Sequence, residues 1–181
     1  KTIFVWPEGI FSGYSFREIS IFKDLITNNF SNKHHIIFGV NRLDPESGNF
    51  YNSMLLVDSN FKIIQSYNKR KLVPFGEFLP FENLLNKFGI KKITEGYGSF
   101  LKGSDNNNLL LNNLRILPLI CYEVIFTNLI QKSEIDTNLV VNISEDGWFG
   151  ETIGPDQHFS KAIFRAVENG TFFIRSANKG V

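Results

Sequence analysis

Cysteine, histidine and an excess of either charge are all scarce in this chain of 181 residues. A single cysteine, Cys121, excludes an internal disulfide framework. Three histidines, His34, His35 and His158, are too few and too badly spaced to predict a metal site. A net charge of +1 provides no basic field of the kind that nucleic-acid-binding proteins carry. We therefore expect no metal, no cofactor and no nucleic-acid partner.

Long apolar runs are missing as well. No run reaches the roughly 18 residues that indicate a membrane-spanning helix, and no signal peptide is recognisable. The chain nevertheless starts at Lys1 without a methionine, inside an apolar run, and stops at Val181 just after a strand-like stretch. This pattern indicates an excerpt from a longer protein, whose membrane segments would lie outside these residues.

The composition that is present is that of a folded domain. Hydrophobic residues make up 43% and charged residues 20% of the chain, and the length suits one globular domain, which we assign to residues 1–181. Strand-like runs alternate with helical ones, and hairpin-like pairs are mixed in. The expected strands cover residues 1–6, 34–41, 51–58, 61–68, 109–120 (two strands), 138–144 and 171–178. The pattern predicts an α/β layered domain with a mixed sheet.

Three helices are expected, over residues 15–30, 122–132 and 154–170. Ser15 and Glu18 form a possible capping box at the start of the first. Pro155 and Gly170 mark the ends of the last. The first helix has an apolar face at helical spacing, made of Phe16, Ile19, Phe22, Leu25 and Ile26.

Three reactive residues each follow a predicted buried strand: Glu8, Lys69 and Cys121. Strand ends are where the sites of α/β proteins gather, because the sheet fixes the side chains while loops enclose the substrate. Taken singly, each residue has a plainer interpretation. A lone cysteine in an apolar run is usually a small core residue, and a glutamate or lysine after a strand is usually solvated.

Together the three residues make a unit for acyl transfer. A cysteine nucleophile needs a base to become a thiolate, and an enclosed carboxylate such as that of Glu8 can serve as that base. The tetrahedral intermediate carries an oxyanion, which a fixed ammonium such as that of Lys69 stabilises. The N–H of Tyr122 lies at the predicted start of a helix, where it is unpaired and can stabilise the same oxyanion.

The order and context of these residues resemble the nitrilase, or carbon–nitrogen hydrolase, superfamily. The matching stretches are "WPE", "YNKRKLVPFGE" and "CYE". The resemblance implies an α-β-β-α sandwich with Glu8 as general base, Lys69 as the oxyanion-stabilising lysine and Cys121 as nucleophile. It also selects Lys69 over the nearby Lys71, and it matches Glu77 to a second glutamate near the triad. By the same resemblance, the sandwich is incomplete at both ends of this chain.

Further motifs resemble one family within that superfamily, the apolipoprotein N-acyltransferases of the bacterial inner membrane. "KLVPFGEFLPFENLL", "ICYEVIF", "WFGETIGPDQH" with a following "RAVE", and "FFIRSANKGV" carry this resemblance over nearly the whole chain. It implies that an acyl chain passes from a phospholipid to the cysteine and then to the α-amino group of a diacylglyceryl-cysteine on a prolipoprotein. It further implies a catalytic domain on the periplasmic side of the membrane.

The family resemblance extends to supporting positions. Tyr122, Glu123 and Trp148 match positions that the family holds around its active site, although the sequence does not explain the role of Glu123. Asp156 departs from the aromatic residue that some relatives have there.

The segment from Lys69 to Ser104 is irregular, and such a segment within a compact domain is usually functional or mobile. Its apolar residues are Phe75, Phe78, Leu79, Phe81, Leu84, Leu85 and Phe88. They predict either a cover over the core or a lid at the membrane surface that admits acyl chains. In the second case Lys87, Lys91 and Lys92 add attraction to anionic lipid.

Two other functions remain open from the sequence. A soluble amidase or nitrile hydrolase would use the same Glu8, Lys69 and Cys121 and would release ammonia from small amides. A remnant that has lost its activity would keep the motifs as well. Hydrophobic spans of about 20 residues on either side would favour the membrane enzyme.

Overall fold

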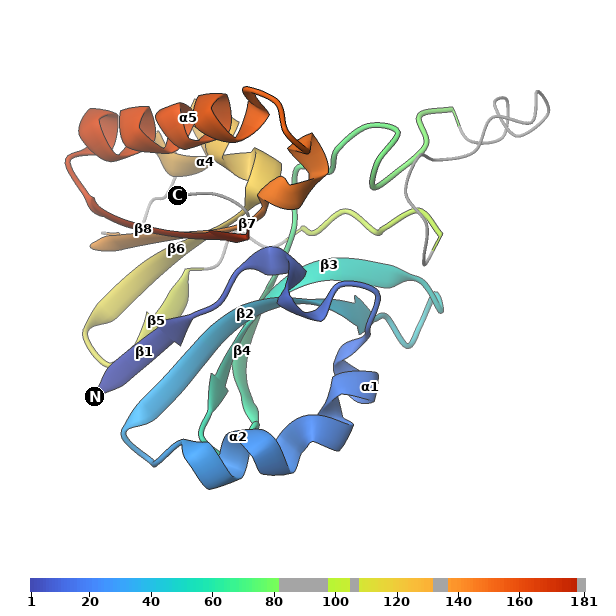
Figure 1. Ribbon diagram of the computed structural model, residues 1–181, viewed down its shortest axis with the longest axis vertical. Helices are drawn as coiled ribbons and strands as arrows, with labels where there is room; N and C mark the ends of the chain where they lie inside the picture. Colours follow the sequence, from blue (N-terminus) through green and yellow to red (C-terminus); the bar gives the residue numbers. More distant parts are fainter. Residues whose placement is uncertain (82–97, 105–107, 132–136, 179–181) are drawn as a thin grey trace.

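Two sheets of four strands each face one another in the computed structural model, which describes residues 1–81, 98–104, 108–131 and 137–178 (Figure 1). The first sheet contains β1 (Thr2–Val5), β2 (His34–Leu43), β3 (Phe50–Asp58) and β4 (Ile63–Asn68). The second contains β5 (Leu109–Leu111), β6 (Leu114–Ile120), β7 (Leu139–Glu145) and β8 (Phe172–Asn178). Both follow chain order and both are mixed, because β1–β2, β6–β7 and β7–β8 pair in parallel and the other neighbours antiparallel.

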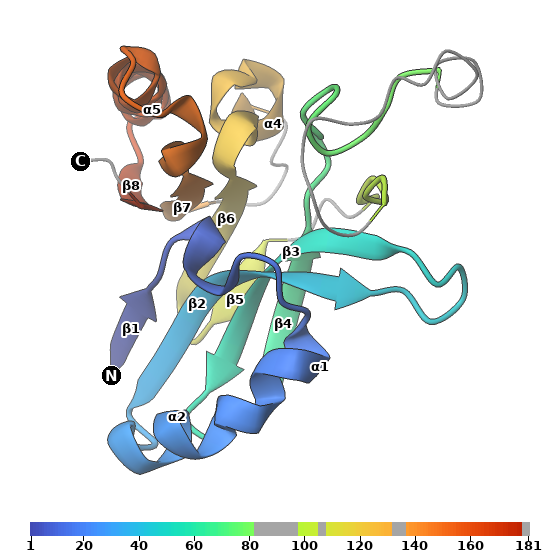
Figure 2. The same ribbon diagram turned by 45° about the vertical axis from the view of Figure 1, so that its right-hand side comes forward.

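Helices cover the outer face of each sheet (Figures 1 and 2). The first sheet carries α1 (Phe16–Ile19) and α2 (Lys23–Asn29), and the second carries α4 (Thr127–Gln131) and α5 (Gly154–Asn169). Short 3-10 helices are η1 (Glu8–Phe11), η2 (Ser20–Phe22), η4 (Cys121–Ile125) and η5 (Asp146–Phe149). The arrangement confirms the predicted α-β-β-α sandwich with mixed sheets. Among the described residues, no helix is both long enough and apolar enough to cross a bilayer.

Strand β2 shows how the layers are held together. Ile36, Phe38 and Val40 pack with the residues under α1 and α2, whereas Ile37 packs between the two sheets. Successive side chains of a strand point to opposite faces. Because both faces of β2 are buried, its sequence is a continuous apolar run and not an alternating one.

The predicted helix over residues 15–30 is wrong in its continuity. The capping box of Ser15 and Glu18 is present, but η2 separates α1 from α2. Ile19 and Ile26 are buried as expected, while Phe22 and Leu25 are 43% and 65% exposed. A 3-10 segment winds three residues per turn instead of 3.6, so it turns part of the predicted apolar face away from the sheet.

The structure agrees with one of the other two predicted helices and divides the other into two elements. The one over residues 122–132 is a 3-10 helix, η4, followed by the short α4. The last one is confirmed as α5, with Pro155 in its first turn and Gly170 as its C-cap in the left-handed conformation at φ 55°. Glycine suits that position because it has no Cβ to clash there.

Candidate active site

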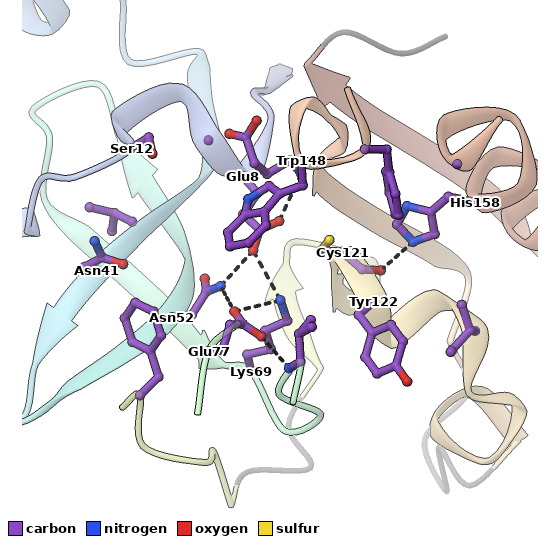
Figure 3. A pocket seen from close by; sticks show the side chains of 18 of the residues that line it. Glu8, Ser12, Asn41, Asn52, Lys69, Glu77, Cys121, Tyr122, Trp148 and His158 are labelled. Atoms are coloured by element: carbon purple, nitrogen blue, oxygen red, sulfur yellow. Dashed lines mark hydrogen bonds and ion pairs between the residues drawn. The ribbon is translucent and has the colours of Figure 1, made fainter. Parts of the chain in front are cut away.

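Three strand ends bring the predicted residues together. Glu8 follows β1 at the start of η1, Lys69 follows β4, and Cys121 follows β6. All three line one cavity of about 580 Å³ (Figure 3). Of the four supporting residues, Glu77, Tyr122 and Trp148 line the same cavity, and Glu123 does not.

Lys69 is a buried ammonium between two carboxylates. Its side chain is 1% exposed, and its Nζ lies 3.3 Å from Glu8 Oε1 and 2.9 Å from Glu77 Oε1. Burial alone would lower the pKa of Lys69, but the charges of Glu8 and Glu77 outweigh it and raise that pKa above its usual range. The lysine therefore stays protonated and can serve as a fixed cation.

Asn52 joins the same group and was not anticipated from the sequence. Its Nδ2 donates to Glu8 Oε1 and to Glu77 Oε1, both at 2.7 Å. One amide nitrogen thus uses both of its hydrogens to brace the two carboxylates. The sequence did contain an indication of this. Side chains alternate between the two faces of a strand, so Asn52 on β3 lies on the same face as Met54 and Leu56, which face the other sheet.

Each carboxylate is also fixed through its second oxygen. Glu8 Oε2 accepts the backbone N–H of Glu145 at 3.0 Å, and Glu77 Oε2 accepts that of Val73 at 2.8 Å. Because Glu145 ends β7, the first of these bonds ties Glu8 to the second sheet. The carboxylate that is proposed as base is therefore held from both sheets.

Cys121 is the first residue of η4, directly after the end of β6. Its φ is 47°, in the left-handed region that a side chain with a Cβ rarely adopts. Burial and the charge of Glu8 raise the pKa of the thiol to about 12, although Lys69 and a hydrogen bond with Ser144 oppose them. The resting group at neutral pH is thus a thiol and not a thiolate, so a nucleophilic role needs a base beside it.

Glu123 connects the two sheets below the cavity. It is fully buried and accepts hydrogen bonds from the Tyr67 hydroxyl at 2.8 Å and from the backbone N–H groups of Arg70 at 2.7 Å and Ile120 at 2.9 Å. Tyr67 and Arg70 flank Lys69 on either side along the chain, and Ile120 precedes Cys121. Glu123 therefore links the backbone around the lysine to the backbone around the cysteine.

Aromatic side chains occupy the cavity mouth and the irregular segment. Trp148 lines the cavity and is 56% exposed. In the segment, Leu79 is buried, whereas Phe75 and Phe81 are 44% and 82% exposed. Phe78 is half-buried. The other residues of the predicted lid or cover, Leu84, Leu85, Lys87, Phe88, Lys91 and Lys92, lie outside the described residues.

His158, the last residue of the "WFGETIGPDQH" motif, was not among the predicted site residues, and it lines this cavity. Its Nδ1 lies 2.9 Å from Asp146 Oδ1. Its Nε2 lies 3.2 Å from the Cys121 carbonyl oxygen (Figure 3). Among the described residues, no group of three or more His, Cys, Asp or Glu side chains is arranged to hold a metal ion.

The fold is that of the nitrilase superfamily. XC1258 from Xanthomonas campestris, described as a CN-hydrolase superfamily protein, aligns with a TM-score of 0.65 at 16% identity over 100% of this chain and 64% of its own. Nit3 from Saccharomyces cerevisiae, a member of branch 10 of the nitrilase superfamily, aligns with a TM-score of 0.61 at 18% identity over 98% of this chain and 62% of its own. At these identities the likeness concerns the fold.

The family follows from the sequence match. The carbon–nitrogen hydrolase family model covers residues 2–181, and the chain belongs to that family. A protein of Rhizobium leguminosarum bv. trifolii named apolipoprotein N-acyltransferase is 46% identical over 133 residues, which are 73% of this chain and 25% of that protein. One of the same name from Bradyrhizobium diazoefficiens is 35% identical over 99% of this chain and 34% of its own length. The predicted resemblance is confirmed, and the chain spans about a quarter to a third of these relatives.

Proposed function

We propose that this chain is the catalytic domain of an apolipoprotein N-acyltransferase. It takes a fatty acyl chain from a phospholipid onto Cys121 and passes it to the α-amino group of a diacylglyceryl-cysteine at a lipoprotein N-terminus. The observation that carries the proposal is that Glu8, Lys69 and Cys121 line one cavity in a chain whose relatives bear that name. The proposed location is the periplasmic side of the bacterial inner membrane.

In the first half of the reaction, Glu8 takes the proton of the Cys121 thiol and Sγ attacks the ester carbonyl carbon of the phospholipid. A C–S bond forms and the carbonyl oxygen becomes an oxyanion, which the Lys69 ammonium and the Tyr122 N–H stabilise. When the oxyanion collapses, the ester C–O bond breaks and Glu8 returns the proton to the departing glycerol oxygen. The products are a lysophospholipid and an acyl thioester on Cys121.

In the second half, the neutral α-amino group of the acceptor attacks the thioester carbonyl carbon. A C–N bond forms, the C–S bond breaks, and Glu8 transfers the proton from the amine to the departing sulfur. The same oxyanion position is used twice, so Lys69 serves both steps. The Cys121 thiol is restored and the lipoprotein carries a new amide.

Supporting residues act in this scheme by holding the reactive ones. Glu77 and Asn52 fix the positions of Glu8 and Lys69 through the contacts of 2.7 to 2.9 Å described above. Glu123 fixes the chain segments that carry Lys69 and Cys121. Trp148 is the apolar group that we assign to contact with the acyl chain at the mouth of the cavity.

The lid hypothesis concerns Phe78 and Phe81 in the irregular segment. Phe81 is 82% exposed, which favours a surface that contacts lipid, whereas the buried Leu79 covers the core. Replacing both phenylalanines with serine should lower the rate of acylation by phospholipid while Cys121 keeps its rate of reaction with iodoacetamide. Equal loss of the two rates would instead indicate that the segment covers the core.

The direct test is to incubate the longest reading frame that contains this chain with phospholipid vesicles and to measure the mass of the peptide with Cys121. We expect a single added acyl chain, which neutral hydroxylamine removes because it is a thioester. Cys121→Ala provides the matched control and should show no adduct. Absence of the adduct from the unsubstituted protein would overturn the proposal.

The same assay separates the two other candidates. A carbon–nitrogen hydrolase of the amidase type would form no adduct with phospholipid and would release ammonia from small amides in a Cys121-dependent reaction. An inactive remnant would do neither, and if its chain no longer folds, its urea unfolding would lack a cooperative transition.

A further inference from the structure

The backbone turn at Cys121, here called the nucleophile turn, has a strained conformation that the acyl-transfer scheme does not explain. Cys121 has φ 47°, where the Cβ of any residue other than glycine is crowded by the backbone. Such a conformation persists only when the surrounding structure holds it. The groups that contact the backbone of this turn are therefore candidates for control of where the sulfur lies.

His158 contacts the turn directly from α5. Its Nε2 lies 3.2 Å from the Cys121 carbonyl oxygen, and its Nδ1 lies 2.9 Å from Asp146 Oδ1. A carbonyl oxygen can only accept hydrogen bonds, so Nε2 carries a hydrogen and donates it to the Cys121 carbonyl. The ring therefore bridges the backbone of Cys121 and the side chain of Asp146.

Two further side chains, those of Arg175 and Ser144, contact Asp146 beside the ring. Arg175 Nη2 lies 3.2 Å from His158 Nδ1 and donates to Asp146 Oδ2 at 2.5 Å. Asp146 Oδ1 also accepts the Ser144 hydroxyl at 2.6 Å. One carboxylate therefore faces Arg175, His158 and Ser144, and Ser144 in turn contacts the thiol of Cys121.

A second arm of the same network reaches the chain just before the nucleophile. Arg175 donates from Nη1 to the Asn142 side-chain oxygen, and Asn142 Nδ2 donates to the Leu119 carbonyl at 3.1 Å. Asn142 is fully buried. The network therefore binds the backbone carbonyls of Leu119 and Cys121, the residues on either side of Ile120. It thus holds the backbone both before and at the nucleophile.

We propose that His158 is a positioning residue: its Nε2–H holds the Cys121 carbonyl, and the buried Asp146 and Arg175 circuit keeps His158 in place. The inference deepens the proposed function, since it concerns the same nucleophile. Without the donor at Nε2, the turn relaxes toward a commoner backbone conformation and Sγ and the Tyr122 N–H move together. Misplacement of reacting groups by about 1 Å can cost on the order of a hundredfold in rate.

Two substitutions at His158 separate this role from simple packing. His158→Gln keeps a donor at the position of Nε2, whereas His158→Asn keeps only one at the position of Nδ1. We expect H158N to lower the rate constant of Cys121 acylation by about tenfold or more, with KM changed by less than about twofold, and H158Q to recover most of the rate. Ser160→Ala, on the exposed side of α5, is the matched control and should behave as wild type.

The readout is made in the longest reading frame that contains this chain, with acylation by phospholipid vesicles and alkylation by iodoacetamide measured on the same samples. Equal losses in H158N and H158Q, or no loss in either, would overturn the positioning role. If H158N does not fold, His158→Met replaces it, because methionine fills a similar volume without a donor. If wild type forms no acyl adduct, the acyltransferase proposal fails by itself, and the ratio of the H158Q to the H158N alkylation rate still decides the positioning role.

Discussion

The two walls of the cavity hold their reactive groups in different ways. On the wall from the first sheet, side chains brace one another: Lys69 lies between Glu8 and Glu77, and Asn52 bridges the two carboxylates. On the wall from the second sheet, the reactive group is Cys121, and a hydrogen bond from His158 to its backbone carbonyl holds it.

This difference between the walls predicts different effects of substitutions on the free energy of unfolding and on the rate of acylation. Buried charges on the first wall need one another, so removal of one leaves the others uncompensated where little solvent reaches them. The turn on the second wall can relax without burying an unpaired charge. We therefore expect substitutions on the first wall to lower stability and activity together, and those on the second wall to lower activity more than stability.

The largest effect is expected from Lys69→Met. The substitution leaves Glu8 and Glu77 buried without their cation, which should lower the free energy of unfolding by about 3–5 kcal/mol and abolish acylation. Urea unfolding followed by circular dichroism measures the first quantity. Lys62→Met, at an exposed position, is the control and should stay within about 0.5 kcal/mol of wild type. A K69M protein as stable as the control would contradict the contrast between the walls.

A smaller effect is expected from Glu123→Gln, which alters the link between the walls. In glutamine an amide nitrogen replaces one carboxylate oxygen and cannot accept the hydrogen bond that this oxygen accepted. The loss should lower the free energy of unfolding by about 1–3 kcal/mol. Since Lys69 and Cys121 are both displaced, acylation should fall further than stability alone explains. Glu46→Gln on the surface is the comparison, and an E123Q protein with wild-type acylation would show that Glu123 does not couple the two walls.

The smallest effect lies in the acid range and concerns Asp146. Burial would raise the pKa of this carboxyl, but hydrogen bonds from His158 and Ser144 and the charge of Arg175 outweigh it and lower the pKa to about 2, from an ordinary value of 3.8. The folded state thus holds the ionised form more strongly than the unfolded state does. Its contribution is complete above about pH 4 and is lost as the pH falls from there toward 2.

The measurement is the free energy of unfolding at several pH values in that window. Wild type should lose stability more steeply than Asp146→Asn, which has no carboxyl to protonate there. Asp156→Asn, on the exposed first turn of α5, should keep the wild-type slope. Parallel slopes in wild type and D146N would contradict the assignment.

The sequence indicated a shared site for Glu8, Lys69 and Cys121 because each follows a predicted strand. In the structure Glu8 and Lys69 follow strands of the first sheet and Cys121 follows one of the second, and all three line one cavity. Sequence patterns predicted α5 because proline and glycine mark its ends. They did not predict the break at η2, since the spacing of apolar residues indicates a helical face but not a change of winding within it.

Local sequence patterns also failed to predict three buried polar residues of the site, Asn52, Asp146 and His158. Their partners are distant in the chain: Asn52 contacts Glu8 and Glu77, and His158 contacts Cys121 across 37 positions. Local patterns report which residues are buried, but the pairing of buried polar groups depends on how two sheets stack. Glu123 has the same explanation, since its donors come from β4, the loop after β4 and β6.

The central claim is that Glu8 on one wall and Cys121 on the other act as base and nucleophile, and Glu8→Gln tests it most directly. Because the thiol is unique in the chain, its rate of reaction with iodoacetamide as a function of pH reports its pKa. In wild type the rate should still rise through pH 10, as the pKa of about 12 requires. In E8Q, loss of the negative charge should lower the midpoint of that titration, while formation of the acyl thioester at neutral pH is lost. An unchanged midpoint, or acylation at the wild-type rate in E8Q, would contradict the account.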